Sequence, residues 1–141
     1  QILELMKNLT EQTGTALVII THNLGIIARY ADRLNVMYAG KIVESGGAEQ
    51  VYMRPSHPYT VGLLNSVPRL DQPTTNRLDP IDGEIPDPTN LPIGCAFRTR
   101  CRWSKYECAL SEPPFVKVQD RQGVACFEAK TVTESVGLAW Q

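Results

Sequence analysis

Residues 15–23 are the stretch that most constrains how this chain can fold. Residues 16–20 are consecutive apolar side chains, and Thr21, His22 and Asn23 follow them directly. So short an apolar run is typical of a strand that is buried on both faces of a parallel sheet. Ligands of such sheets bind beyond the carboxyl ends of the strands, where His22 stands. Its imidazole could contact a phosphate or a water near neutral pH. On position alone, a histidine that only bonds a loop carbonyl is the favoured interpretation.

The neighbouring patterns predict an α/β fold. Helical periodicity covers residues 2–13 and ends at Gly14, which is suited to a left-handed C-cap. A second helix is expected over residues 24–31. Residues 34–39 predict a strand, and a turn at Gly40 leads into an alternating edge strand at residues 42–46. The result is a β-α-β unit followed by a hairpin. Short helices are then expected at residues 48–53 and from Pro58 to Val67.

The chain divides into four segments. Residues 1–67 hold the α/β elements, and residues 68–92 form a linker that contains Pro68, Pro73, Pro80, Pro86, Pro88 and Pro92. Residues 93–128 carry every cysteine, and we expect little regular structure there. Residues 129–141 form a tail in which Val136, Leu138 and Trp140 could dock on the rest.

The composition is that of a globular protein with almost no net charge. Lysine and arginine number 14 against 15 aspartates and glutamates, which predicts no bulk attraction to nucleic acid or to a membrane surface. No run of apolar residues is long enough to cross a bilayer, and no signal peptide opens the chain. The first helix begins without an N-cap residue, so we interpret the sequence as a fragment of a longer cytoplasmic protein.

Three stretches together resemble the C-terminal part of ATP-binding-cassette (ABC) ATPases, most closely the subunits that power oligopeptide and dipeptide importers. They are ALVIITHNL (residues 16–24), LNVMYAGKIVESG (34–46) and SHPYTVGLLNSVPRL (56–70). The resemblance implies the C-terminal β-α-β and hairpin portion of a nucleotide-binding domain, followed by a small irregular cysteine-rich extension. It also implies that His22 is the switch histidine that contacts the γ-phosphate of ATP, and this favours a catalytic role for His22. His57 is expected to cap or pack a helix.

The same resemblance implies partners and cofactors for an intact parent protein. These are ATP with Mg²⁺, a second ABC ATPase subunit, and transmembrane permease subunits that would hold the protein on the cytoplasmic side of the membrane. The sequence contains no Walker A loop, Q-loop, LSGGQ signature or acidic Walker B strand. Since those segments cradle the phosphates and hold Mg²⁺, we expect the chain alone to be inactive as an ATPase.

Four cysteines, Cys95, Cys101, Cys108 and Cys126, form the second candidate site. Disulfides are disfavoured in the cytosol, so metal binding is the better interpretation. The gaps of five, six and seventeen residues include none of the short pairs typical of zinc sites. Four thiolates at more varied spacing also hold iron–sulfur clusters.

The surroundings of the cysteines leave alternatives open. Arg98, Arg100, Arg102 and Lys105 would offset the charge of a metal–thiolate core, but a solvated basic face explains them equally well. The importer family includes members with a cysteine-bound 4Fe-4S cluster, which favours that cofactor over zinc. A histidine often precedes the last cysteine in that family, whereas residues 120–123 here are Asp-Arg-Gln-Gly. The alternative is a non-enzymatic metal module that binds nucleic acid or a protein partner, although no nucleic acid is expected from the charge.

Overall fold

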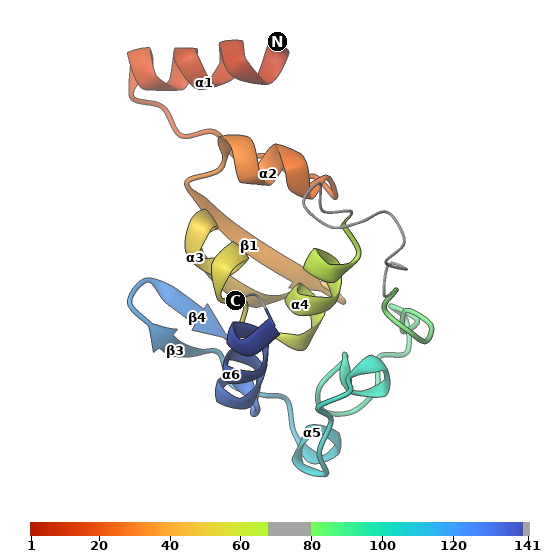
Figure 1. The fold of residues 1–141 in the computed structure, drawn as a ribbon. Helices are drawn as coiled ribbons and strands as arrows, with labels where there is room; N and C mark the ends of the chain where they lie inside the picture. The colour runs from red at the N-terminus through yellow and green to blue at the C-terminus, as the bar shows by residue number, and fades with distance from the viewer. Residues whose placement is uncertain (68–79, 140–141) are drawn as a thin grey trace.

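A four-stranded antiparallel sheet lies at the centre of the protein (Figure 1). The computed structural model describes residues 1–67 and 80–139. The strands are β1 (Arg33–Tyr38), β2 (Lys41–Gly47), β3 (Val116–Gln119) and β4 (Gln122–Val124), in the order β1-β2-β4-β3. The first two strands form the expected hairpin, with Gly40 at a φ of 78° in its turn. The sheet thus joins residues 33–47 to residues 116–124, which are far apart in the sequence.

The helices of the first 67 residues lie where the sequence predicts them. They are α1 (Ile2–Thr13), α2 (Leu24–Tyr30), α3 (Ala48–Met53) and α4 (Pro58–Asn65). Gly14 ends α1 with a φ of 68°, and its N–H donates to the Thr10 carbonyl. Asn23 caps α2, because its side chain accepts hydrogen bonds from the N–H groups of Gly25 and Ile26. Each boundary has a local cause that is visible in the sequence.

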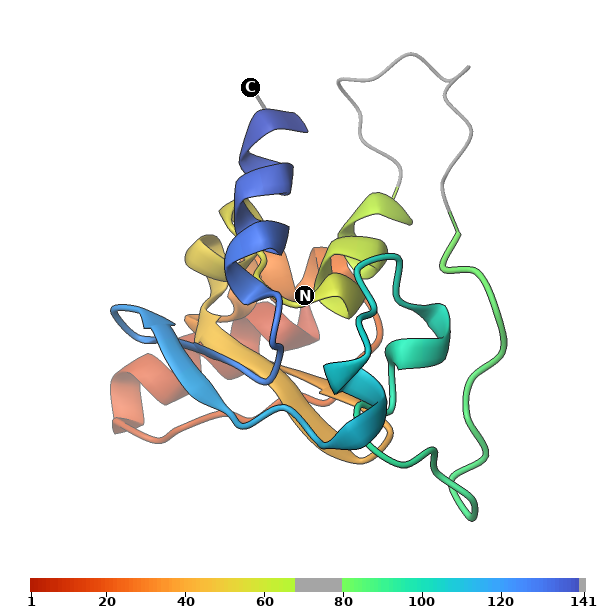
Figure 2. The ribbon, with the colours of Figure 1, turned by 90° about the horizontal axis from the view of Figure 1, so that it is seen from below.

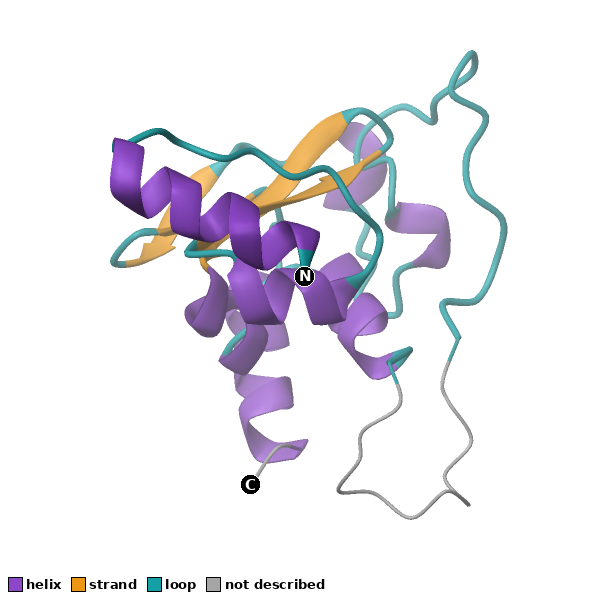
Figure 3. Cartoon of the chain, turned by 90° about the horizontal axis from the view of Figure 1, so that it is seen from above, coloured by secondary structure: helices purple, strands orange, loops and turns teal. Residues whose placement is uncertain are grey.

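The prediction of a buried strand at residues 15–20 is wrong. This segment is not part of the sheet, and Figure 3 draws it as a loop between α1 and α2. Val18 is 85% exposed and Ile20 is 98% exposed. A strand buried on both faces needs a hydrogen-bonding neighbour and covering elements, and no described residue supplies them here. The predicted β-α-β unit therefore does not form, and β1 and β2 run antiparallel.

The prediction that residues 42–46 form an edge strand is also wrong. β2 lies between β1 and β4, with Glu44 opposite Val124 and Ser45 opposite Gly123. The alternating sequence does not correspond to one buried and one exposed face, because the adjacent residues Val43 and Glu44 are both buried. The neighbour that covers β2 comes from far along the chain.

The cysteine-bearing segment is more regular than predicted. It contains a short 3₁₀ helix, η1 (Arg98–Arg100), a one-turn helix, α5 (Glu107–Leu110), and the strands β3 and β4. A final helix, α6 (Ala129–Ala139), lies beside α4 (Figure 2). Val136 docks as predicted, since it is buried with Val132 against Val61 of α4. The side chain of Leu138 and all of Trp140 lie outside the described residues.

The described part of the proline-rich segment, residues 80–92, contains no helix or strand, as expected. Residues 68–79 lie outside the described residues. Ile81 packs directly on Gly62 of α4, so closely that a Cβ added to this glycine would meet the Ile81 side chain at 2.6 Å. Arg100 fixes the same stretch by donating to the carbonyl oxygens of Ile81 and Asp82 at 2.8 and 2.9 Å. This part of the linker is thus held against the body of the protein.

The core is aromatic on one side and aliphatic on the other. Tyr38, Tyr59 and Phe97 form one cluster, with ring centroids 4.7 to 5.5 Å apart. The aliphatic cluster joins α4 to α6. Among the described residues, no helix is long and apolar enough to span a membrane.

Candidate functional site

His22 lies on the loop that leads into α2. Thr21 and Asn23 fix the loop on either side of it, because the Asn23 N–H donates to the Thr21 hydroxyl at 3.0 Å. The His22 side chain is exposed. Within residues 1–67 and 80–139 it has no hydrogen bond or ion pair. The imidazole therefore does not serve the loop-carbonyl role considered above, and it is available to a ligand or to another part of a larger protein.

His57 begins α4 and is almost completely buried, with 1% of its surface exposed. Its Nδ1 accepts a hydrogen bond of 3.1 Å from the Tyr59 N–H, which confirms the predicted capping role. Pro58 takes the first helical position, where a missing N–H costs nothing. Burial lowers the pKa of His57 from 6.5 to about 3. The imidazole is thus neutral at physiological pH.

Glu44 organises the turn that precedes α4. Its carboxylate is fully buried and accepts hydrogen bonds from the N–H groups of Ser56 (2.8 Å) and His57 (3.0 Å). Gln122 of β4 donates its side-chain amide to the same carboxylate at 2.7 Å. Burial raises the pKa of the Glu44 carboxyl, and the hydrogen bonds that it accepts oppose the rise. A buried carboxylate is tolerated here because its oxygens are bonded.

Gln122 and Thr133 extend this network into the C-terminal part of the chain. The Gln122 amide also reaches the Arg54 carbonyl at 3.0 Å and the Ser56 hydroxyl at 3.2 Å. Thr133 of α6 donates to that hydroxyl at 2.9 Å. We call Glu44, Ser56, His57, Gln122 and Thr133 the buried polar network. It joins β2, the turn before α4, β4 and α6 in one unit.

Sequence reasoning did not find Glu44 or Gln122 as important residues. Glu44 lies in a stretch of alternating apolar and polar residues, where an acid is expected to face solvent, so no local signal marked it as buried. Its donors lie 12, 13 and 78 positions away. Only the folded chain identifies them.

The four cysteines are not arranged as a metal site in this structure. Among residues 1–67 and 80–139, no group of three or more His, Cys, Asp or Glu side chains is placed to hold a metal ion. All four cysteines are free thiols. The Cys95 N–H does bond the Cys108 carbonyl at 2.8 Å, so two of the segments lie together. The structure thus does not support the predicted iron–sulfur or zinc site.

The pKa values of three of the thiols are raised, first by burial and then by neighbouring cysteines. Burial raises the pKa of Cys126 to about 12 and that of Cys101 to about 11, and it also raises the pKa of Cys95. Metals bind the thiolate form, so each of these groups would have to lose a proton first. Of the expected cations, Lys105 pairs with Glu128, and Arg102 stacks over the Trp103 ring at 3.9 Å.

Residues 43–108 match the family described as "Oligopeptide/dipeptide transporter, C-terminal region". The matched range contains Glu44 and the whole His57-Pro58-Tyr59 turn. This chain carries the C-terminal region of that family. The match therefore confirms the resemblance seen in the sequence. The matched range also includes Cys95, Cys101 and Cys108.

Relatives with assigned names agree with this assignment. Over 133 residues the chain is 45% identical to the oligopeptide transport ATP-binding protein OppD of Mycobacterium tuberculosis, covering 94% of this chain and 22% of that protein. It is 47% identical over 120 residues to OppD of Bacillus subtilis, covering 85% and 34%. It is 44% identical over 132 residues to a Brucella ovis protein provisionally named a peptide import ATP-binding protein, covering 90% and 39%. The chain thus spans well under half the length of these relatives.

Proposed function

We propose that this chain is the C-terminal part of an ATP-hydrolysing subunit that drives an oligopeptide or dipeptide importer. The observation that carries this proposal is the family match over residues 43–108. In the parent, the segments that cradle the phosphates of ATP and hold Mg²⁺ would be ones that this chain does not contain, and His22 would add one contact to the γ-phosphate. A second ATPase subunit and the permease subunits would be its partners, on the cytoplasmic side of the membrane.

In this proposal His22 contacts the γ-phosphate of ATP. Its support is the exposed imidazole on a loop that Thr21 and the N-cap residue Asn23 hold in place. A neutral imidazole can donate one hydrogen bond and accept another, which suits a group that orients both a phosphate and an attacking water. Such a contact stabilises mainly the transition state, so it raises the rate more than the affinity.

The test uses the full-length parent ATPase carrying His22→Ala. ATP binding should stay near wild type, whereas hydrolysis should fall by about 10²–10³-fold, the usual effect of removing one group that stabilises developing charge. Lys117→Ala, an exposed position on β3, is the matched control and should keep the wild-type rate. Near-normal hydrolysis by His22→Ala would overturn the assignment.

A cluster on the cysteines is a separate and finer proposal. It is supported by the count of four thiols and by the contact between the Cys95 and Cys108 backbones. It requires the thiols to move together and lose their protons, because the described structure does not present them as ligands. The role proposed for His22 does not depend on it.

A further inference from the structure

A cavity of about 190 Å³ opens beside the turn between β1 and β2. The lining includes residues of that turn, residues 91–92 and 94–97, and residues 112–113. Apart from His57, Cys95 and two charged residues, the lining is apolar or aromatic; it includes Tyr38, Ile42, Leu91, Ala96, Phe97 and Pro113. Every residue of the lining lies within the described part of the chain. The interior is therefore suited to an apolar group.

The two charged residues of the lining have opposite signs and touch each other. Lys41 Nζ lies 2.5 Å from Glu112 Oε2, and both side chains are more than half exposed. Their positions bring one ammonium and one carboxylate to the cavity. Because an exposed ion pair contributes little to stability, a ligand can exchange with it at small cost. A ligand that carries both charges would satisfy Lys41 with its carboxylate and Glu112 with its ammonium group.

The volume sets the size of the apolar part of such a ligand. Apolar cavities of about 150 Å³ accommodate a molecule the size of benzene. The present cavity is slightly larger, so a branched aliphatic or a phenyl side chain would fill it. A polar side chain would lose hydration on entering a cavity whose lining is mostly apolar.

We propose that this cavity binds a free zwitterionic α-amino acid with an apolar side chain. Lys41 binds the carboxylate, Glu112 binds the ammonium group, and the side chain enters between Ile42 and Phe97. For a ligand with so few atoms, the dissociation constant is on the order of 1 mM. The inference does not depend on the ATPase role, because the site is complete within this chain.

The test is an NMR titration of the isotopically labelled chain, which follows the backbone amides of the cavity wall. L-leucine and L-phenylalanine should shift the amides of Ile42, Gly94 and Ala96 and saturate below about 20 mM. Leucyl-leucine carries its ammonium and its carboxylate on different residues, so it should bind at least about tenfold more weakly than L-leucine. Glycine lacks the side chain and N-acetyl-leucinamide lacks both charges, so each should bind at least about tenfold more weakly.

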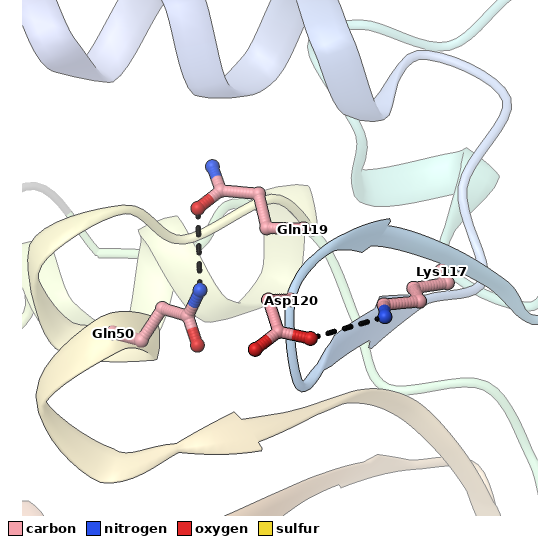
Figure 4. Close-up of polar contacts among 4 residues, drawn as sticks. All are labelled: Gln50, Lys117, Gln119 and Asp120. Carbon is pink, nitrogen blue, oxygen red and sulfur yellow. Dashed lines mark hydrogen bonds and ion pairs between the residues drawn. The ribbon is translucent and has the colours of Figure 1, made fainter.

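Two variants test whether binding depends on the charges of Lys41 and Glu112 as well as on the apolar cavity. Lys41→Ala and Glu112→Ala should each weaken L-leucine binding at least about tenfold. The matched control is the ion pair of Lys117 and Asp120, at 3.1 Å on the β3–β4 hairpin (Figure 4), whose double alanine variant should bind normally. Absence of saturable shifts with wild type would overturn the proposal. Equal binding of N-acetyl-leucinamide, or unchanged binding by both charge variants, would also overturn it and leave only an apolar cavity.

Discussion

Acid should destabilise this protein through one residue, His57. The imidazole is buried and neutral in the folded state, with a pKa lowered from 6.5 to about 3 by burial. In the unfolded chain it is free to take up a proton below pH 6.5. The unfolded state therefore binds more protons than the folded state between pH 6.5 and 3, and stability falls as the pH falls through this range.

The expected magnitude follows from the difference between the two pKa values. Each unit of that difference corresponds to about 1.4 kcal/mol, and the unfolded imidazole is already half protonated at pH 6.5, so lowering the pH from 6.5 to 4.5 should cost about 2.3 kcal/mol. The exposed acids Asp87 and Glu128 have lowered pKa values, so their own contributions are lost mainly below this window. The raised pKa of Glu44 acts in the opposite direction, since the folded state then takes up a proton above pH 4.5. The measured change of stability with pH will therefore be the His57 contribution minus the opposing contribution of Glu44.

The assay is urea unfolding followed by circular dichroism at several pH values. His57→Asn keeps a side-chain acceptor at the start of α4 but has no proton to gain, so its stability should rise slightly towards pH 4.5 because only the Glu44 contribution is left. His22→Asn is the matched control, because His22 is exposed, and it should keep the wild-type slope. If His57→Asn and wild type lost stability equally with acid, the reasoning would be refuted.

Three further predictions concern other parts of the chain. Gln122→Leu should lower the free energy of unfolding by about 3 kcal/mol, because Glu44 loses a charge-assisted donor; Gln119→Leu, which loses only a bond to Gln50 (Figure 4), should cost under about 1 kcal/mol in the same urea assay. The cluster proposal predicts that anaerobically expressed protein contains about four irons per chain and loses them on any Cys→Ser change. Colourless protein with one zinc would exclude the cluster. The exposed residues 17–20 should cause self-association that Val18→Lys suppresses, as measured by light scattering; a monomer at high concentration would contradict this.

The elements that could be predicted are those with local causes. Gly14 ends α1, Pro58 starts α4, and Gly40 turns the first hairpin, and each acts through its own backbone preferences. The capping role of His57 was also predictable, since it precedes a proline at a helix start. Such signals need no knowledge of distant residues.

The errors occurred where the structure depends on distant partners. Residues 15–20 have the composition of a buried strand, but composition does not supply the neighbours that a strand requires. Conversely, β4 has only three residues and no clear pattern, and it exists because β2 offers it an edge. The cysteines show the same dependence on distant residues. Their number suggests a set of metal ligands, but their placement depends on how the intervening segments of five, six and seventeen residues fold.

The buried polar network and the loop of His22 belong to the same packed unit. Glu44 lies on β2, and the following helix α3 packs back on that strand, with Val51 against Gly46. Tyr52, also on α3, donates a hydrogen bond to the Leu24 carbonyl at the start of α2, two residues after His22. If residues 116–139 were displaced, Gln122 would move with them. Because Gln122 is hydrogen-bonded to Glu44, this movement would shift β2 and then α3, which packs on β2. Because each step is a direct contact between buried or half-buried groups, the position of His22 should be sensitive to how the extension is packed.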